Sequence, residues 1–144
     1  MNREAEGAAG LPFEMHIERG KIAEFARAIG ATHAEHFEGE RPVAPATFLT
    51  TMAFWEAAVA GSNPWSLLEL DVGRARHAEQ SFEFFGSPPR AGDRLICQSR
   101  LESITEKPGR RGVLMFAVMV TEFVDPDTGR LVARARLSGV EVPA

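Results

Sequence analysis

The segment 45–61, PATFLTTMAFWEAAVAG, decides the fold that the sequence predicts. Proline favours the first position of a helix and glycine follows the last, so the segment is expected to form one helix. Apolar residues occupy nearly every face of this helix, and Glu56 is its only charged residue. A helix that is apolar on all sides must be buried on all sides. At about 1.5 Å per residue it would run roughly 22 Å, the width of a sheet of several strands.

Alternating apolar and polar residues predict strands on both sides of this helix. The stretch PFEMHIERG (12–20) has the pattern of a half-buried strand, and KIAEFARAIG (21–30) has the spacing of a short amphipathic helix. SLLELDV (66–72) is expected to be one more short strand. Four longer strands are predicted in HAEQSFEFFG (77–86), DRLICQSRLESITE (93–106), VLMFAVMVTEFV (113–124) and RLVARARLSGVEV (130–142). Consecutive strands joined by short turns form an antiparallel meander, so we expect an α+β fold whose sheet wraps the helix.

The composition describes a single small domain. The 144 residues are 44% hydrophobic, enough for one core, and we expect one domain over 11–144 preceded by a flexible tail over 1–10. The net charge is −4 and the arginines are scattered, which argues against a nucleic-acid binder. The single cysteine, Cys97, cannot form an internal disulfide and lies in an apolar context typical of the core. No signal pattern or membrane-length apolar run occurs, so a soluble cytoplasmic protein is expected.

Residues able to do chemistry gather in GATHAEHF (30–37), just before the apolar helix. This stretch holds two of the four histidines, His33 and His36, and Glu35 lies between them. An imidazole titrates near neutral pH and is the most common general base in proteins. The two histidines also have the spacing of half a metal site, but no third ligand is evident, and no metal is expected.

Several motifs together give a resemblance to a known family. They are HIERGKIAEFARAIG (16–30), VAPATFL (43–49), HAEQSFEF (77–84), PPRAGDRL (88–95) and DTGRLVARAR (127–136). On these stretches the sequence resembles the MaoC-like hot-dog hydratases and dehydratases, in particular their FAS1-like dehydratase branch. The resemblance implies a hot-dog fold, in which a curved antiparallel sheet wraps around one long buried helix.

The resemblance also implies an activity and partners. The family includes enoyl-thioester hydratases and (3R)-hydroxyacyl-thioester dehydratases of fatty-acid metabolism, which act on acyl-CoA or acyl-carrier-protein (ACP) thioesters with no separate cofactor. Hot-dog domains of this kind form dimers. In two-subunit dehydratases of the family, one chain is catalytic and its partner supplies much of the acyl tunnel. A homodimer or a heterodimer with a second hot-dog subunit is therefore expected, with no nucleic-acid or membrane partner.

The loop departs from the family pattern at its carboxylate. In active members of the family that this chain resembles, the catalytic loop usually reads Asp-x-Asn-Pro-x-His. On this chain the Asp position is Ala31 and the His position is His36. The resemblance thus implies that His36 is the base. His33, at the Asn position, is a candidate donor, and Glu35 and Glu38 are candidates to replace the missing acid. General acid–base groups contribute about 10²–10⁴-fold each, so the loss of one is a large change.

The beginning of the apolar helix is the implied site for the thioester oxygen. Pro45 has no N–H, so the backbone N–H groups of Ala46 and Thr47 are the expected donors to the oxyanion. Phe48 and Trp55 complete the set of residues expected to bind substrate.

Two interpretations of the function remain open. One is a homodimeric hydratase or dehydratase that uses His36. The other is a non-catalytic hot-dog subunit that binds the acyl chain and needs a catalytic hot-dog partner. The missing carboxylate favours the second, whereas the retained His36 and the VAPATF motif favour the first. Elsewhere, Glu56 is expected to be capped or at an interface, His77 to pair with Glu79 or a turn, and Asp93 to fix a turn.

Overall fold

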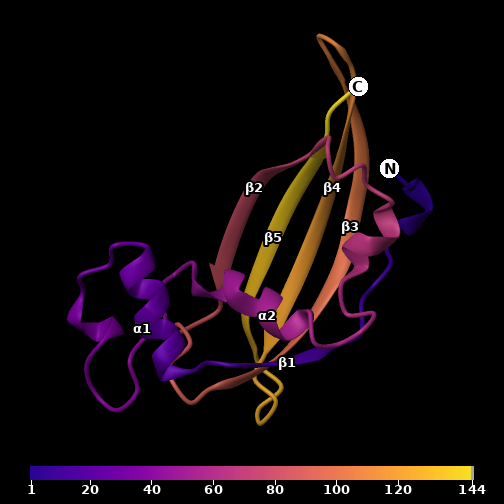
Figure 1. The fold of residues 1–144 in the computed structure, drawn as a ribbon. Helices are drawn as coiled ribbons and strands as arrows, with labels where there is room; N and C mark the ends of the chain where they lie inside the picture. Colours follow the sequence, from indigo (N-terminus) through magenta and orange to yellow (C-terminus); the bar gives the residue numbers. More distant parts are fainter. Residues whose placement is uncertain (144) are drawn as a thin grey trace.

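The computed structural model describes residues 1–143 as one antiparallel sheet with short helices beside it (Figure 1). The strands are β1 (Phe13–His16), β2 (Ala75–Phe84), β3 (Arg94–Gly109), β4 (Gly112–Val124) and β5 (Leu131–Glu141). The α-helices are α1 (Arg19–Ala28) and α2 (Ala53–Glu56), and 3₁₀ turns cover Arg3–Ala5, Ala34–His36, Phe48–Met52 and Pro64–Leu68. No helix in residues 1–143 has the length and apolar character needed to cross a membrane.

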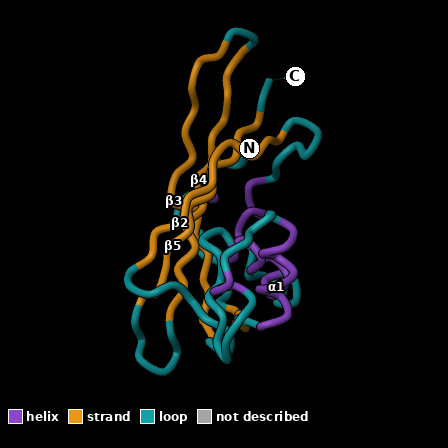
Figure 2. Tube along the Cα trace, turned by 90° about the vertical axis from the view of Figure 1, so that its left-hand side faces the viewer, coloured by secondary structure: helices purple, strands orange, loops and turns teal. Residues whose placement is uncertain are grey.

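The sheet has the strand order β1-β3-β4-β5-β2, and every neighbouring pair is antiparallel. β3 and β4 form a long hairpin, closed by Gly109 and Gly112, that extends beyond the other strands (Figure 1). Seen from the side, the helical segments gather on one side of the sheet (Figure 2). This arrangement confirms the expected α+β architecture.

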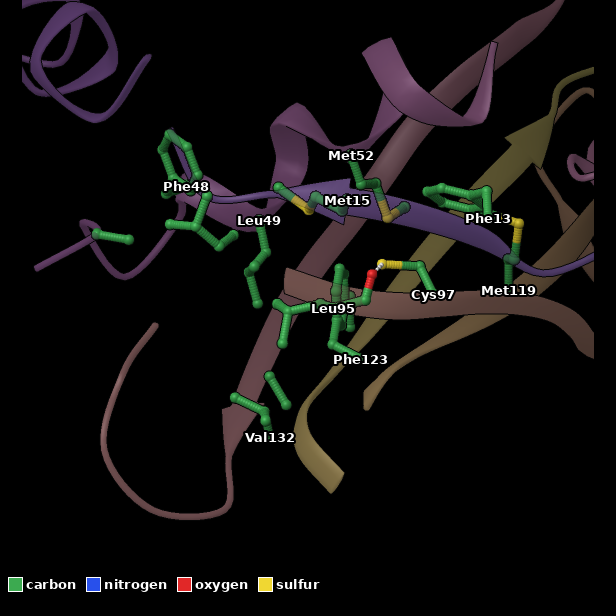
Figure 3. Packing of buried hydrophobic residues seen from close by; sticks show 14 of the residues in the cluster. Phe13, Met15, Phe48, Leu49, Met52, Leu95, Cys97, Met119, Phe123 and Val132 are labelled. Atoms are coloured by element: carbon green, nitrogen blue, oxygen red, sulfur yellow. Dashed lines mark hydrogen bonds between the residues drawn. The ribbon is translucent and has the colours of Figure 1, made fainter. Parts of the chain in front are cut away.

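The core lies between this helical layer and the sheet (Figure 3). Strand residues at alternate positions face inward, which is why the period-two pattern predicts them. Cys97 is fully buried among them, which confirms its expected place in the core. The central segment contributes large apolar side chains to the same cluster, and fully burying one such side chain contributes about 1.5–3 kcal/mol. The labelled members include Phe13, Met15, Phe48, Leu49, Met52, Leu95, Met119 and Phe123.

The central segment is shorter and less regular than the sequence predicts. Phe48–Met52 is a 3₁₀ turn, and only Ala53–Glu56 is α-helical. The N–H of Phe48 donates to the carbonyl of Pro45, the i→i−3 pattern of the tighter helix. One side also stays open, and Phe54 is 69% exposed because the single sheet covers only the opposite side. The structure thus corrects the expected long, fully buried helix to a short one with an uncovered face.

The segment 66–72 also differs from its expected strand. Asn63 accepts a hydrogen bond from the N–H of Trp65 at 2.9 Å, and Pro64 occupies the first position of the 3₁₀ turn Pro64–Leu68. An Asn cap followed by Pro is a helix-start signal, and here it prevails over the short apolar pattern.

Residues 1–10 differ from the expected flexible tail. The N–H of Gly7 donates to the carbonyl of Leu101 at 2.8 Å, and that of Gly10 donates to Ser99 at 2.9 Å. These bonds continue along β3 the pairing that β1 begins. Backbone hydrogen bonds to β3 order this segment, and amino-acid composition does not predict such bonds.

β2 is an edge strand of the sheet. Within residues 1–143 it pairs only with β5, and most of its residues are exposed or half-buried. A long strand with unpaired edge amides is a template for pairing with another chain. β2 and the Phe54 side of α2 are therefore two surfaces that this chain leaves uncovered.

Gly139 in β5 makes room for Trp65. A Cβ at position 139 would lie 2.8 Å from Cζ2 of the indole ring, closer than two carbon atoms pack. We expect Gly139→Ala to lower the free energy of unfolding by about 1–3 kcal/mol. Gly20→Ala in α1 is the control: a Cβ there meets nothing within 4 Å, so it should raise the free energy of unfolding by about 0.4–1 kcal/mol. Urea unfolding measures both, and a stabilised Gly139→Ala would contradict this packing.

Candidate functional site

The loop that holds both histidines joins α1 to the central segment. Its only regular element is the 3₁₀ turn Ala34–His36. The N–H of Val43 donates to the carbonyl of Glu35 at 2.8 Å, which closes the loop on itself. In Figure 1 this loop and α1 lie beside the sheet, next to the beginning of the central segment.

His36 is buried and held in one orientation. The residue is 9% exposed, and Nδ1 of its ring lies 2.8 Å from the carbonyl oxygen of Val43. A carbonyl can only accept, so Nδ1 carries the proton in this bond. The neutral imidazole then presents its lone pair at Nε2, the arrangement that a general base needs. The structure thus places the expected base out of bulk water.

The candidates to assist His36 lie outside this buried position. His33 is exposed, and its ring centroid is 6.3 Å from that of His36 in an edge-on arrangement. Glu35 is also exposed. Ala31 has no side chain that can exchange a proton, and no carboxylate of residues 1–143 forms an ion pair or hydrogen bond with the His36 ring. The imidazole is therefore present without the acid that accompanies it in the family pattern.

The two expected oxyanion donors are available. Ala46 and Thr47 are exposed, next to the buried Pro45, and within residues 1–143 neither N–H donates a hydrogen bond. The segment from Val43 to Ala46 links these amides to the His36 ring, which is bonded to Val43. The His36 ring is thus hydrogen-bonded to Val43, three residues before Ala46.

The two aromatic residues expected to bind substrate have different environments. Phe48 is fully buried and meets the ring of Phe25 edge-on, with ring centroids 5.6 Å apart. Trp55 is half-buried, and Nζ of Lys21 lies 5.8 Å from its ring. Phe48 is therefore a core residue in this chain, whereas Trp55 keeps a surface that a ligand could touch.

A metal centre has no support from the side chains in place. Within residues 1–143, no three His, Cys, Asp or Glu side chains come together as ligands. His33 and His36 are therefore not part of a larger ligand group in the described residues.

Glu56, expected from the sequence to be capped or at an interface, lies inside the core of this chain. It is 6% exposed, and its Oε1 accepts a hydrogen bond from Oγ of Ser99 at 3.3 Å. Ser99 in turn lies 2.8 Å from Oγ1 of Thr121. Burial raises the pKa of Glu56 above its ordinary value, and the hydrogen bond from Ser99 opposes this only in part. Burial, and then the charge of Glu56, also raise the pKa of Cys97, so its thiol is no nucleophile at neutral pH.

Two further expectations are confirmed. His77 places Nε2 3.1 Å from the backbone oxygen of Glu79. Asp93 accepts a hydrogen bond from the N–H of Arg90 at 2.8 Å and so fixes the turn before β3. Both residues therefore have local structural roles.

A cleft lined by arginines is the feature that sequence analysis missed. It has a volume of about 510 Å³ and lies at the end of the sheet where β2 ends and β4 turns into β5. Four arginines line it: Arg41, Arg90, Arg94 and Arg130. Three separate stretches of the chain supply these side chains, so no local charge pattern reveals the cluster.

Sequence comparison places the chain among dehydratase-related proteins. The sequence model described as "FAS1-like, dehydratase domain region" matches residues 7–135. A UPF0336 protein of Streptomyces griseus is 32% identical over 127 residues, which cover 83% of this chain and 79% of that protein. A UPF0336 protein of Mycolicibacterium paratuberculosis is 31% identical over 137 residues, covering 87% and 75%.

Solved structures share the architecture. The (3R)-hydroxyacyl-ACP dehydratase complex HadBC of Mycobacterium tuberculosis matches with a TM-score of 0.74 and 25% identity over 94% of this chain and 96% of that chain. A MaoC-like dehydratase matches with a TM-score of 0.76 and 23% identity, covering 97% and 43%. The ChsH1-ChsH2 complex of M. tuberculosis has a TM-score of 0.71 and 14% identity, covering 99% and 88%. These matches confirm the hot-dog fold.

The burial of Glu56 predicts a pH-dependent stability. Its folded-state pKa is raised, so its contribution to stability is complete below about pH 4.5, the ordinary pKa, and is lost as the pH rises through the raised value. We expect Glu56→Gln to unfold at a higher temperature than the wild type at pH 7. The difference should shrink as the pH falls and vanish well below pH 4.5, where Glu56 is protonated in both the folded and the unfolded state.

Thermal unfolding of both proteins across this pH range is the measurement. Glu24→Gln, at an exposed position of α1, is the matched control and should change little at either pH. A wild type as stable as Glu56→Gln at pH 7 would show that the carboxylate is not buried.

Proposed function

The chain belongs to the FAS1-like dehydratase family, and we propose that it is one subunit of a (3R)-hydroxyacyl-thioester dehydratase, which catalyses enoyl-thioester hydration in the reverse direction. The substrates proposed are acyl-CoA or acyl-ACP thioesters. The observation that carries this proposal is the incomplete site: His36 is buried and oriented, but no carboxylate accompanies it. A second hot-dog chain with a complete site then performs the chemistry, and this chain binds part of the acyl group.

The reaction explains why one missing group matters. Hydration adds the hydroxyl of water to C3 of the enoyl thioester and a proton to C2, while negative charge gathers on the thioester oxygen. Nε2 of His36 can take the proton from water, and the N–H groups of Ala46 and Thr47 can hold the oxygen. Ala31 leaves no side chain that orients the water or delivers the second proton.

The uncovered surfaces support the need for a partner. β2 offers a free strand edge, and the exposed Phe54 offers an apolar side chain on the open face of α2. A second hot-dog domain that extends the sheet beyond β2 and covers α2 would bury both. The likeness to HadBC, a complex, supports a heterodimer over a single chain.

The proposed reaction requires no metal and no further cofactor, because the acyl group arrives on its CoA or ACP carrier. This substrate class supports a role in fatty-acid metabolism, and the proposed location is the cytoplasm.

A second candidate function is a homodimeric hydratase that works alone. The bond from Nδ1 of His36 to Val43 favours it, because this bond fixes the tautomer that a base requires. In this form His36 would act on water without a carboxylate partner.

Enoyl hydration assays separate the two candidates. The purified chain is assayed on crotonyl-CoA and on a longer enoyl-CoA, alone and with a catalytic hot-dog subunit from the same organism. We expect little turnover alone and full turnover in the complex, with His36→Ala in this chain changing the rate of the complex by less than about twofold. Turnover alone that falls by about 10²–10⁴-fold in His36→Ala would establish the homodimeric enzyme instead.

Restoring the carboxylate tests the site assignment itself. We expect Ala31→Asp to raise the hydration rate of the isolated chain, because it supplies the one group that the loop lacks. A gain approaching the roughly 10²–10⁴-fold that general acid–base groups contribute is the upper bound. Ala34→Asp, in the same loop, is the control and should give no gain. Equal rates for both variants and the wild type would show that the loop is not an active-site loop.

A further inference from the structure

The arginine cleft is formed by three stretches of the chain at one end of the sheet. Its walls are the loop 87–95 that leads into β3, the turn 125–132 between β4 and β5, and Arg41. Its volume of about 510 Å³ is that of a small-molecule site. In Figure 1 the turn between β4 and β5 lies at the end of the sheet opposite the tip of the β3–β4 hairpin.

Three carboxylates line the cleft and each is already engaged, that of Asp127 lying 3.5 Å from Nη2 of Arg94. Asp93 accepts from the N–H of Arg90 at 2.8 Å and forms an ion pair with Arg41. Asp125 accepts from the N–H of Asp127 at 2.9 Å, the main reason that its pKa is lowered. These acids therefore fix the turns that form the walls.

Two of the guanidinium groups have no carboxylate within ion-pair distance, although the charge of Arg130 helps to lower the pKa of Asp125. Within residues 1–143, Arg90 and Arg130 form no ion pair. Arg90 only donates to the carbonyl of Arg41 at 3.2 Å. The Nη1 atom of Arg130 lies 3.0 Å from the position that a Cβ on Gly86 would take, so this guanidinium lies against the backbone where β2 ends. Two guanidinium groups without an ion pair thus line the same concave space.

The cleft is joined directly to the candidate site. The N–H of Ala44 donates to the carbonyl of Pro89 at 2.9 Å, and that of Ala91 donates to Pro42 at 2.9 Å. Val43, which holds the His36 ring, forms a bridge with Arg90. The segment 42–44, which precedes the free amides of Ala46 and Thr47, is therefore hydrogen-bonded to the loop that carries Arg90.

We propose that this cleft binds the phosphate of the thioester's carrier, with Arg90 and Arg130 as its direct ligands. The inference rests on the proposed function for its substrate class. Guanidinium groups match phosphate oxygens with paired, charge-assisted hydrogen bonds. Either the nucleotide end of CoA or the 4′-phosphopantetheine arm of a carrier protein can supply this phosphate.

Calorimetric titration of the full chain tests the proposal without any assay of activity. The probes are 4′-phosphopantetheine, pantetheine without the phosphate, and adenosine 3′,5′-bisphosphate. We expect at least one phosphate-bearing probe to bind and pantetheine to bind at least tenfold more weakly. The variant with Arg90→Gln and Arg130→Gln should lose at least tenfold in affinity for that probe, and the affinity should fall with added salt.

A second double variant is the matched control. Arg110→Gln with Arg111→Gln removes the same charge at the tip of the β3–β4 hairpin and should leave the affinity unchanged. Binding of adenosine 3′,5′-bisphosphate identifies CoA as the source, and binding of 4′-phosphopantetheine alone identifies a carrier protein. Equal losses in both double variants, or no binding of any probe, would overturn the proposal. Because binding is measured directly, a chain that binds the phosphate probe but supports no hydration even with its catalytic partner would contradict the proposed reaction and leave the cleft assignment standing.

Discussion

The structure depends on one constraint: a single five-stranded sheet can cover only one side of an apolar helical segment. The segment 45–61 carries apolar residues on nearly every face, yet the sheet of this chain buries only the side that holds Phe48, Leu49 and Met52. The opposite side remains open at Phe54, and the β2 edge has no partner within residues 1–143. The uncovered face of the central helix and the free β2 edge support the proposal that a second domain covers them.

The candidate site has the same incomplete character. Val43 holds the His36 ring with Nε2 free, and the amides of Ala46 and Thr47 are unengaged, but Ala31 supplies no carboxylate. The absence of this acid beside a buried and oriented imidazole supports the proposal of a subunit that needs a catalytic partner. The proposed phosphate site in the arginine cleft is consistent with this role, because a subunit without proton transfer of its own could still hold the carrier of the substrate.

The sequence predicts the strands well because their alternation is set by a single inner face, and Cys97 falls on that face as its apolar neighbours indicate. The predicted length and full burial of the central helix are wrong, because an apolar pattern does not tell whether the surface that covers it belongs to the same chain. The 3₁₀ turn at Pro64–Leu68 replaces an expected strand, since the Asn63 cap outweighs a few alternating residues. In the site, the motif locates His36 and the amides. Two features could not be predicted from local sequence: the burial of Glu56 against Ser99, and the shared cleft of Arg41, Arg90 and Arg130. Both depend on distant segments coming together in the fold.

Hydrogen exchange of the β2 backbone amides tests the need for a second domain most directly. The chain is measured at a concentration low enough to keep it monomeric, and again with a catalytic hot-dog subunit from the same organism. The account predicts fast exchange on the outward-facing edge of Ala75–Phe84 in the monomer and strong protection of that edge in the complex. Equally fast exchange in both samples, with no complex formed, would contradict it.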